Sequence, residues 1–152
     1  MAGVSSALPV GAEACRRPAC GRHAAGRSTP DAHCVAACYA SFRDQLAGAE
    51  QVWTSRCDAC SRVEGLDLKF VLHAGSYVVQ PVGGGRELVG PEVVMAHRLL
   101  KNHAAELIGR SAYALITEAA AARLAVPPGA AVELTETYDH YPSIAARVHA
   151  LG

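Results

Sequence analysis

The sequence lacks the features that direct a protein to nucleic acid or to a membrane. Its 152 residues carry 14 basic and 14 acidic side chains, so the formal net charge is zero. Without an excess of positive charge, no long-range field draws the chain to nucleic acid or to anionic lipid. No apolar run reaches the roughly 18 residues of a membrane span, and the start lacks the basic and apolar regions of a secretory signal. We therefore expect a cytoplasmic protein that binds neither nucleic acid nor membranes.

Two chemical motifs are also missing. The chain has no Gly-x-Ser-x-Gly elbow, which argues against hydrolase chemistry. Its 6 cysteines do not form the two Cys-x-x-Cys pairs of a typical structural zinc site. Cys57 and Cys60 make one such pair, and a second set contains Cys20, His23, Cys34 and Cys38. A small Cys-rich metal-binding protein stays open as an alternative, although we expect no zinc at Cys57 and Cys60. A redox role for that pair is disfavoured, because a helix precedes it and a strand follows it, the reverse of the thioredoxin order.

The composition indicates one folded domain behind an unstructured start. With 51% hydrophobic residues, a chain of this length buries one ordinary core. Residues 1–34 consist mainly of Ala, Gly, Arg, Pro, Ser and Cys without apolar periodicity, so we expect a disordered segment, or a non-native one that replaced the true start of the domain. The domain itself is expected at residues 35–152.

Hydrophobic periodicity within that domain predicts an α+β fold. An amphipathic helix is expected over residues 35–53, and alternation predicts an antiparallel hairpin formed by residues 68–73 and 76–82. Extended structure resumes at 86–89, and Gly90-Pro91 opens a helix that we expect to reach residue 108. The apolar stripe expected to face the sheet contains Val93, Ala96, Leu100, Ala104 and Leu107.

Three further elements complete the expected order. A strand is predicted over residues 113–116, followed by a short helix that Thr117 caps and that ends near Leu124. A final strand is predicted over 131–138, with Val132 and Leu134 inward and Glu133 and Thr135 outward. Residues 140–152 are only weakly patterned.

The segment from Leu66 to Thr117 resembles part of a known family. The order of elements and the spacing from Gly90 to Ala96, Arg98 and Leu99 are similar to the second half of a class III nucleotidyl (adenylate/guanylate) cyclase domain. The run from Ala96 to Asn102 is closer still to an uncharacterised bacterial branch of that superfamily. The resemblance implies a partial ferredoxin-like cyclase fold over the chain from residue 35 onward.

The resemblance also implies site residues. Arg98 stands where active cyclases carry the arginine that contacts the transferring phosphate, a task suited to the guanidinium fork. Glu87 stands at the purine-binding position, where aspartate is more usual, and Val94 replaces an expected asparagine. From the residues alone, an exposed helix arginine explains Arg98 equally well, and an exposed strand glutamate explains Glu87 better than a purine contact does.

The metal-binding half of such a domain is not found in this chain. Cyclisation needs divalent ions held by two carboxylates, and Asp31, Asp44, Asp58 and Asp67 do not stand in the required strand contexts. We expect no metal site of its own, with Mg²⁺ or Mn²⁺ entering only if a first half or a partner protomer completes the domain. The strand at residues 68–73 would lack its neighbour, and this open sheet edge favours a homodimer or a cyclase-like partner. The expected function is an inactive cyclase-homology module that signals by binding or dimerisation; the alternative is a fragment of a full cyclase-like enzyme.

Overall fold

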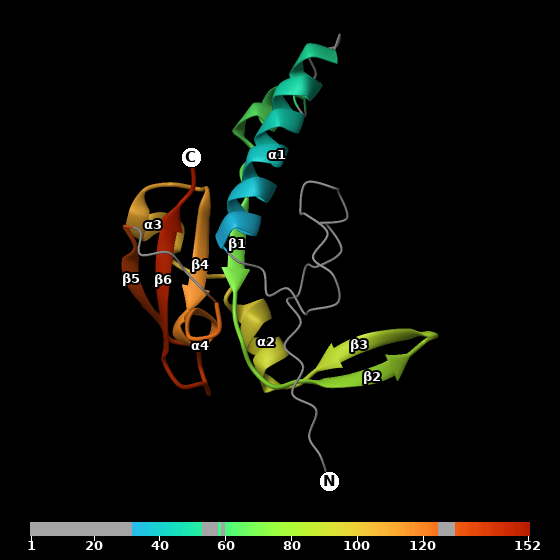
Figure 1. The fold of residues 1–152 in the computed structure, drawn as a ribbon, viewed down its shortest axis with the longest axis vertical. Coiled ribbons are helices and arrows are strands. Elements are labelled where there is room, and N and C mark those ends of the chain that lie inside the picture. The colour runs from blue at the N-terminus through green and yellow to red at the C-terminus, as the bar shows by residue number, and fades with distance from the viewer. Residues whose placement is uncertain (1–31, 53–57, 59, 125–129) are drawn as a thin grey trace.

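The computed structural model describes residues 32–52, 58, 60–124 and 130–152, and they form the mixed α+β fold that the sequence predicts (Figure 1). The elements in chain order are α1 (Ala32–Val52), η1 (Cys60–Gly65), β1 (Lys69–Leu72), β2 (Val78–Val82), β3 (Gly85–Val89), α2 (Pro91–Arg98), α3 (Ala104–Ile108), β4 (Tyr113–Thr117), α4 (Glu118–Ala121), β5 (Val132–Glu136) and β6 (Ile144–Ala150). None of the helices described is both long and apolar enough to cross a membrane.

Four strands form the main sheet in the order β1-β4-β6-β5. β1 runs parallel to β4, whereas β6 is antiparallel to both of its neighbours. The chain between β1 and β4 contains a separate two-stranded sheet, β2-β3, which projects from the body of the molecule, and then α2 and α3 (Figure 1). β1 and β5 are therefore the edge strands of the main sheet within the part of the chain that the structure describes.

The core lies between the α2-α3 segment and the centre of the sheet. Leu99 and Leu115 are completely buried, and burial of apolar side chains of this kind is the main favourable contribution to folding. The buried cluster consists of Met95, Leu99, Ala104, Tyr113, Leu115, Ala146 and Val148. The helical segment that follows β1 is thus fixed against β4 and β6.

The expected hairpin between residues 68–73 and 76–82 is wrong. β2 pairs instead with β3, with Val82 opposite Gly85, and β1 belongs to the other sheet. Gly83 and Gly84, which make the turn, have φ angles of 56° and 86°. Positive φ at both central residues is the geometry of the tight hairpin turns that match strand twist, and glycine adopts it without a steric penalty.

The single helix expected over residues 91–108 is also wrong, because it is divided at residues 99–103. Asn102 causes the break: its side-chain amide donates to the carbonyl oxygen of Leu99 at 2.7 Å, and its oxygen accepts from the backbone N–H of Ala104 at 2.9 Å. Such a side chain competes with the helical backbone, and here it also binds the first N–H group of α3. The break rotates the buried face, so Leu100 and Leu107 are 45% and 47% exposed and the expected stripe is wrong there.

The remaining elements agree more closely with the prediction. α1, β1, β4 and β5 lie where helix or strand was expected, and the Thr117 hydroxyl caps α4 by accepting from the backbone N–H of Ala120. α1 begins at Ala32, whereas residues 1–31, most of the segment expected to be disordered, lie outside the described residues. β6 was not expected, although it occupies an interior position in the sheet.

Candidate functional site

Polar side chains meet at the carboxyl ends of β1 and β4. The two strands are parallel, so His73, which follows β1, and Thr117, the last residue of β4, lie at the same end of the sheet. Glu92, in the first turn of α2, joins them. We refer to His73, Glu92 and Thr117 as the His73 cluster.

The His73 cluster is a short hydrogen-bonded chain. One ring nitrogen of His73, Nε2, lies 2.7 Å from Oε2 of Glu92, and the other, Nδ1, lies 3.1 Å from Oγ1 of Thr117. The His73 side chain is 6% exposed, whereas that of Glu92 is 44% exposed. A side chain at Gly75 would overlap that of Glu92, so this close approach of the loop to α2 requires glycine.

The order hydroxyl, imidazole, carboxylate is the order of a nucleophile with its base and its orienting acid. Thr117, however, is 1% exposed, and its hydroxyl already caps α4 and contacts the carbonyl oxygen of Leu72. A nucleophile must reach substrate, which this oxygen does not. The cluster therefore acts structurally: it joins the start of α2 and the start of α4 to the end of β1.

Arg98 lies in the last turn of α2, on the exposed surface. Its guanidinium carbon is 4.8 Å from the centroid of the Tyr141 ring, a distance typical of cation–π contacts. Stacking holds one face of the guanidinium and leaves its N–H edges available. Arg98 has no carboxylate within ion-pair distance in the described part of the chain.

Glu87 lies on the projecting hairpin, opposite Gln80 and exposed to solvent. Among the described residues, no hydrogen bond or ion pair joins Glu87 to Arg98. Val94, at the position of the expected asparagine, is 44% exposed on α2. The two residues to which the resemblance gives roles thus stand on separate elements, without direct contact within one copy of the chain.

Sequence reasoning missed a buried carboxylate, Glu136, at the end of β5. Glu136 is 2% exposed. Its Oε1 atom accepts the backbone N–H of His103 at 2.7 Å, and its Oε2 atom lies 3.1 Å from Nδ1 of the His103 ring. This hydrogen bond and then the negative charge of Glu136 raise the pKa of His103. The signal was present, because the alternation that places Leu134 inward also places Glu136 inward. Val132, which was expected inward as well, is 44% exposed at the start of the strand. Glu136 fixes the 99–103 turn and thereby the end of α2 that carries Arg98.

The described residues contain no group of three or more His, Cys, Asp or Glu side chains arranged to hold a metal ion. Asp67, in the loop before β1, accepts the hydroxyl of Ser111 at 3.1 Å. Asp31 and Cys57 lie outside the described residues, and Cys60 begins η1.

Comparison with known proteins identifies relatives whose functions are not described. A protein of Mycobacterium tuberculosis (strain ATCC 25618 / H37Rv), "Uncharacterized protein Rv2561/Rv2562", is 33% identical over 97 residues, which are 59% of this chain and 44% of that protein. The chain thus spans less than half the length of this relative. No solved structure matches. Residues 27–107, which contain α1, β1, the β2-β3 hairpin and α2, match the family described as "Protein of unknown function (DUF2652)". Because this segment is more than half of the 152 residues, the chain belongs to that family.

Proposed function

We propose that this chain is the second half of a nucleotidyl cyclase-like domain, which acts in cytoplasmic signalling by pairing with another chain and makes no cyclic nucleotide alone. The observation that carries the proposal is the position of β1. Its one neighbour in the described sheet is β4, on one side, and no described strand pairs with the other side. In a complete domain of the class that the sequence resembles, the first strand would occupy this position and extend the sheet toward a ferredoxin-like arrangement.

The open edge of β1 is suited to pairing with a second copy. Natural edge strands are often protected by a lysine that points along the edge. Lys69, the charged residue of β1, instead donates from Nζ to the carbonyl oxygen of Leu100 at 2.9 Å, which holds it against the α2-α3 connection. A two-fold axis beside β1 would let two copies of the strand pair with each other.

The β2-β3 hairpin supports the proposal by supplying apolar area for such a contact. Val78 and Val89 form a cross-strand pair, and Val82 lies on the same face because it is four residues from Val78. Val78 is 67% exposed, Val89 is 43% exposed and Val82 is 44% exposed. A two-stranded sheet without a covering layer is only marginally stable in water, so contact with a partner would stabilise the hairpin.

The proposal gives Arg98 a role only in an assembly. The resemblance places this residue at a phosphate contact, and its N–H edges are available for that contact. The carboxylates that would hold Mg²⁺ or Mn²⁺ would come from the partner. A chain with intact metal-binding aspartates would thus use Arg98 across the interface.

A second candidate is that the sequence is part of a longer cyclase-like enzyme that converts a nucleoside triphosphate to a cyclic nucleotide. The observation that favours it is the length of the mycobacterial relative, of which this chain matches only 44%. In that case the missing strands would belong to the same polypeptide and would cover β1 directly.

The test combines mass and activity. We expect sedimentation equilibrium to show a mass that doubles with concentration, and no cyclic product from ATP or GTP with Mg²⁺ or Mn²⁺. Mixing with a cyclase-like chain that carries the metal-binding aspartates should produce activity that Arg98→Ala removes. Arg123→Ala is the control, because Arg123 is an exposed arginine that follows α4 and belongs neither to β1 nor to the β2-β3 hairpin. A chain that is monomeric at all concentrations and gives no gain on mixing would refute the proposal; cyclic product made by the chain alone would refute it as well.

A further inference from the structure

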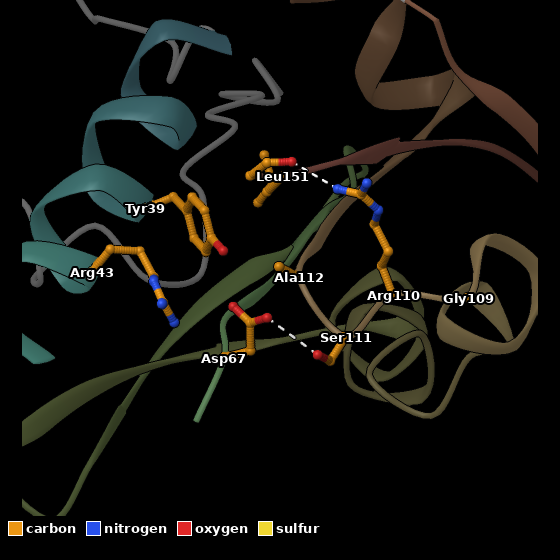
Figure 2. Close-up of a pocket in the computed structure, with 9 residues that line it drawn as sticks. Tyr39, Arg43, Asp67, Gly109, Arg110, Ser111, Ala112 and Leu151 are labelled. Carbon is orange, nitrogen blue, oxygen red and sulfur yellow. Dashed lines mark hydrogen bonds between the residues drawn. The ribbon is translucent and has the colours of Figure 1, made fainter. Parts of the chain in front are cut away.

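A second site lies at the opposite end of the parallel strands from the His73 cluster. Asp67 precedes β1, and Ser111 and Ala112 precede β4, so these residues meet at the amino ends of the two strands. α1 contributes Tyr39 and Arg43 from the other side (Figure 2). The residues line an open crevice with a volume of about 590 Å³, within the range of small-molecule sites. We call it the amino-end pocket.

The charged groups of the amino-end pocket favour a negatively charged ligand. Arg43 comes from α1 on one side of the pocket, and Arg110 comes from the other side (Figure 2). Arg43 has no carboxylate within ion-pair distance in the described part of the chain, and Arg110 donates one N–H to an oxygen of Gly152, the last residue of the sequence. Asp67 is the one acidic side chain in the lining.

Asp67 is already occupied by neutral donors. One of its oxygens accepts the backbone N–H of Leu68 at 3.0 Å, and the other accepts the Ser111 hydroxyl at 3.1 Å. Its carboxylate therefore orders the wall of the pocket. Among the described residues no acceptor binds the N–H groups of Arg43, and Arg110 uses one N–H for Gly152 and keeps the others available.

The walls of the pocket are held in place before any ligand binds. Arg110 donates from Nη1 to the carbonyl oxygen of Gly152 at 2.7 Å. The Tyr39 hydroxyl approaches Gly152 so closely that a Cβ there would lie 3.2 Å from it. Desolvation, and then the charge of Asp67, raise the pKa of Tyr39, so the phenol remains a hydrogen-bond donor at neutral pH. Fixed donors of this kind reduce the ordering cost of binding.

We infer that the amino-end pocket binds a small molecule through an oxyanion, a phosphate or a carboxylate group, held between the guanidinium groups of Arg43 and Arg110. Arginine suits this task because its planar fork donates two parallel hydrogen bonds to such a group. The inference does not rest on the proposed function, because neither Arg98 nor the open edge of β1 forms part of the pocket.

Calorimetric titration of the full chain with inorganic phosphate, and separately with succinate, tests the inference and distinguishes the two oxyanions. We expect at least one probe to bind with saturation. Because a hydrogen bond to a charged group contributes about 1.5–3 kcal/mol, Arg43→Gln and Arg110→Gln should each weaken binding by about tenfold or more. Arg86→Gln, on the distant hairpin, should bind like the unchanged chain.

Two controls make the result decisive. Circular dichroism of each variant shows whether it is folded, and the Tyr39 ring signal in an NMR titration reports binding at the pocket itself. The inference is overturned if neither probe saturates, if the Tyr39 signal does not move during a saturating titration, or if the folded Arg43 and Arg110 variants bind as tightly as the Arg86 variant. Loss of dimerisation would leave this result unchanged, which separates it from the test of the proposed function.

Discussion

Replacement of His73 by alanine should destabilise the fold measurably, because this ring joins three elements. It contacts Glu92 at the start of α2 and Thr117 at the start of α4, and it is itself the residue that follows β1. Its side chain is 6% exposed, so water does not replace the lost contacts freely.

The magnitude follows from the two hydrogen bonds. The bond between His73 and Thr117 contributes about 1 kcal/mol, the usual net value for a neutral pair. A bond to a carboxylate contributes about 1.5–3 kcal/mol, and the lower end applies because Glu92 is 44% exposed. Thr117 retains its contacts with Leu72 and Ala120, so no buried hydroxyl is left without a partner. We expect His73→Ala to lower the free energy of unfolding by about 2–3 kcal/mol.

Urea unfolding followed by circular dichroism measures this change as a shift of the midpoint at constant slope. His97→Ala is the matched control, since His97 is exposed on α2 and its replacement should change the free energy by no more than about 0.5 kcal/mol. In a Glu92→Ala background, His73→Ala should cost about 1.5 kcal/mol less, which isolates the bond between them. The reasoning is refuted if His73→Ala and His97→Ala are equally mild.

Four further changes test the core, a helix cap and the pH dependence. Leu99→Ala should cost about 2–5 kcal/mol of unfolding free energy, because Leu99 is completely buried, whereas Leu100→Ala should be nearly neutral in the same urea titration. Thr117→Val should cost about 2 kcal/mol, because it removes both the α4 cap and the hydrogen bond to His73, and Thr117→Ser should retain most of this stability. The raised pKa of His103 adds stability that is fully present below the ordinary histidine pKa near 6.5 and is lost as the pH rises through the raised pKa. His103→Gln should therefore destabilise the fold mainly at acid pH. Equal destabilisation at all pH values would contradict this prediction. Desolvation and then the charge of Arg147 lower the pKa of His149, so protonation of this ring destabilises the fold as the pH falls below about 6.5. His149→Phe should lessen that loss of stability at acid pH.

Local patterns predicted most of the elements but not how they pair. The strands at β1 and β4 and the Thr117 cap could be predicted because alternation and capping act over a few residues. Pairing depends on distant parts of the chain, and β1 took β4 as its partner rather than its neighbour in sequence. The pairing of β2 with β3 could have been predicted from Gly83 and Gly84, since two successive glycines favour a tight hairpin turn.

Two other differences had weaker signals. Asn102 lies within an otherwise continuous helical pattern, and only its bonds to Leu99 and Ala104 show that it separates the two helices. β6 alternates with Ile144, Ala146 and Val148 toward the core, but alanine contributes little to a hydrophobic pattern. The His73 cluster could not be predicted, because its members are separated by up to 44 residues and meet only when β1 and β4 pair.

Amide hydrogen exchange along β1 tests the central claim most directly. In a strand with one partner, alternate N–H groups face the open side and exchange quickly unless another strand covers them. We predict that these N–H groups of Lys69–Leu72 exchange quickly when the chain is dilute, and that they become protected at the concentration at which its mass doubles. If the mass doubles while they continue to exchange quickly, or if they are protected in the monomer, the open edge of β1 is not the surface through which this chain acts.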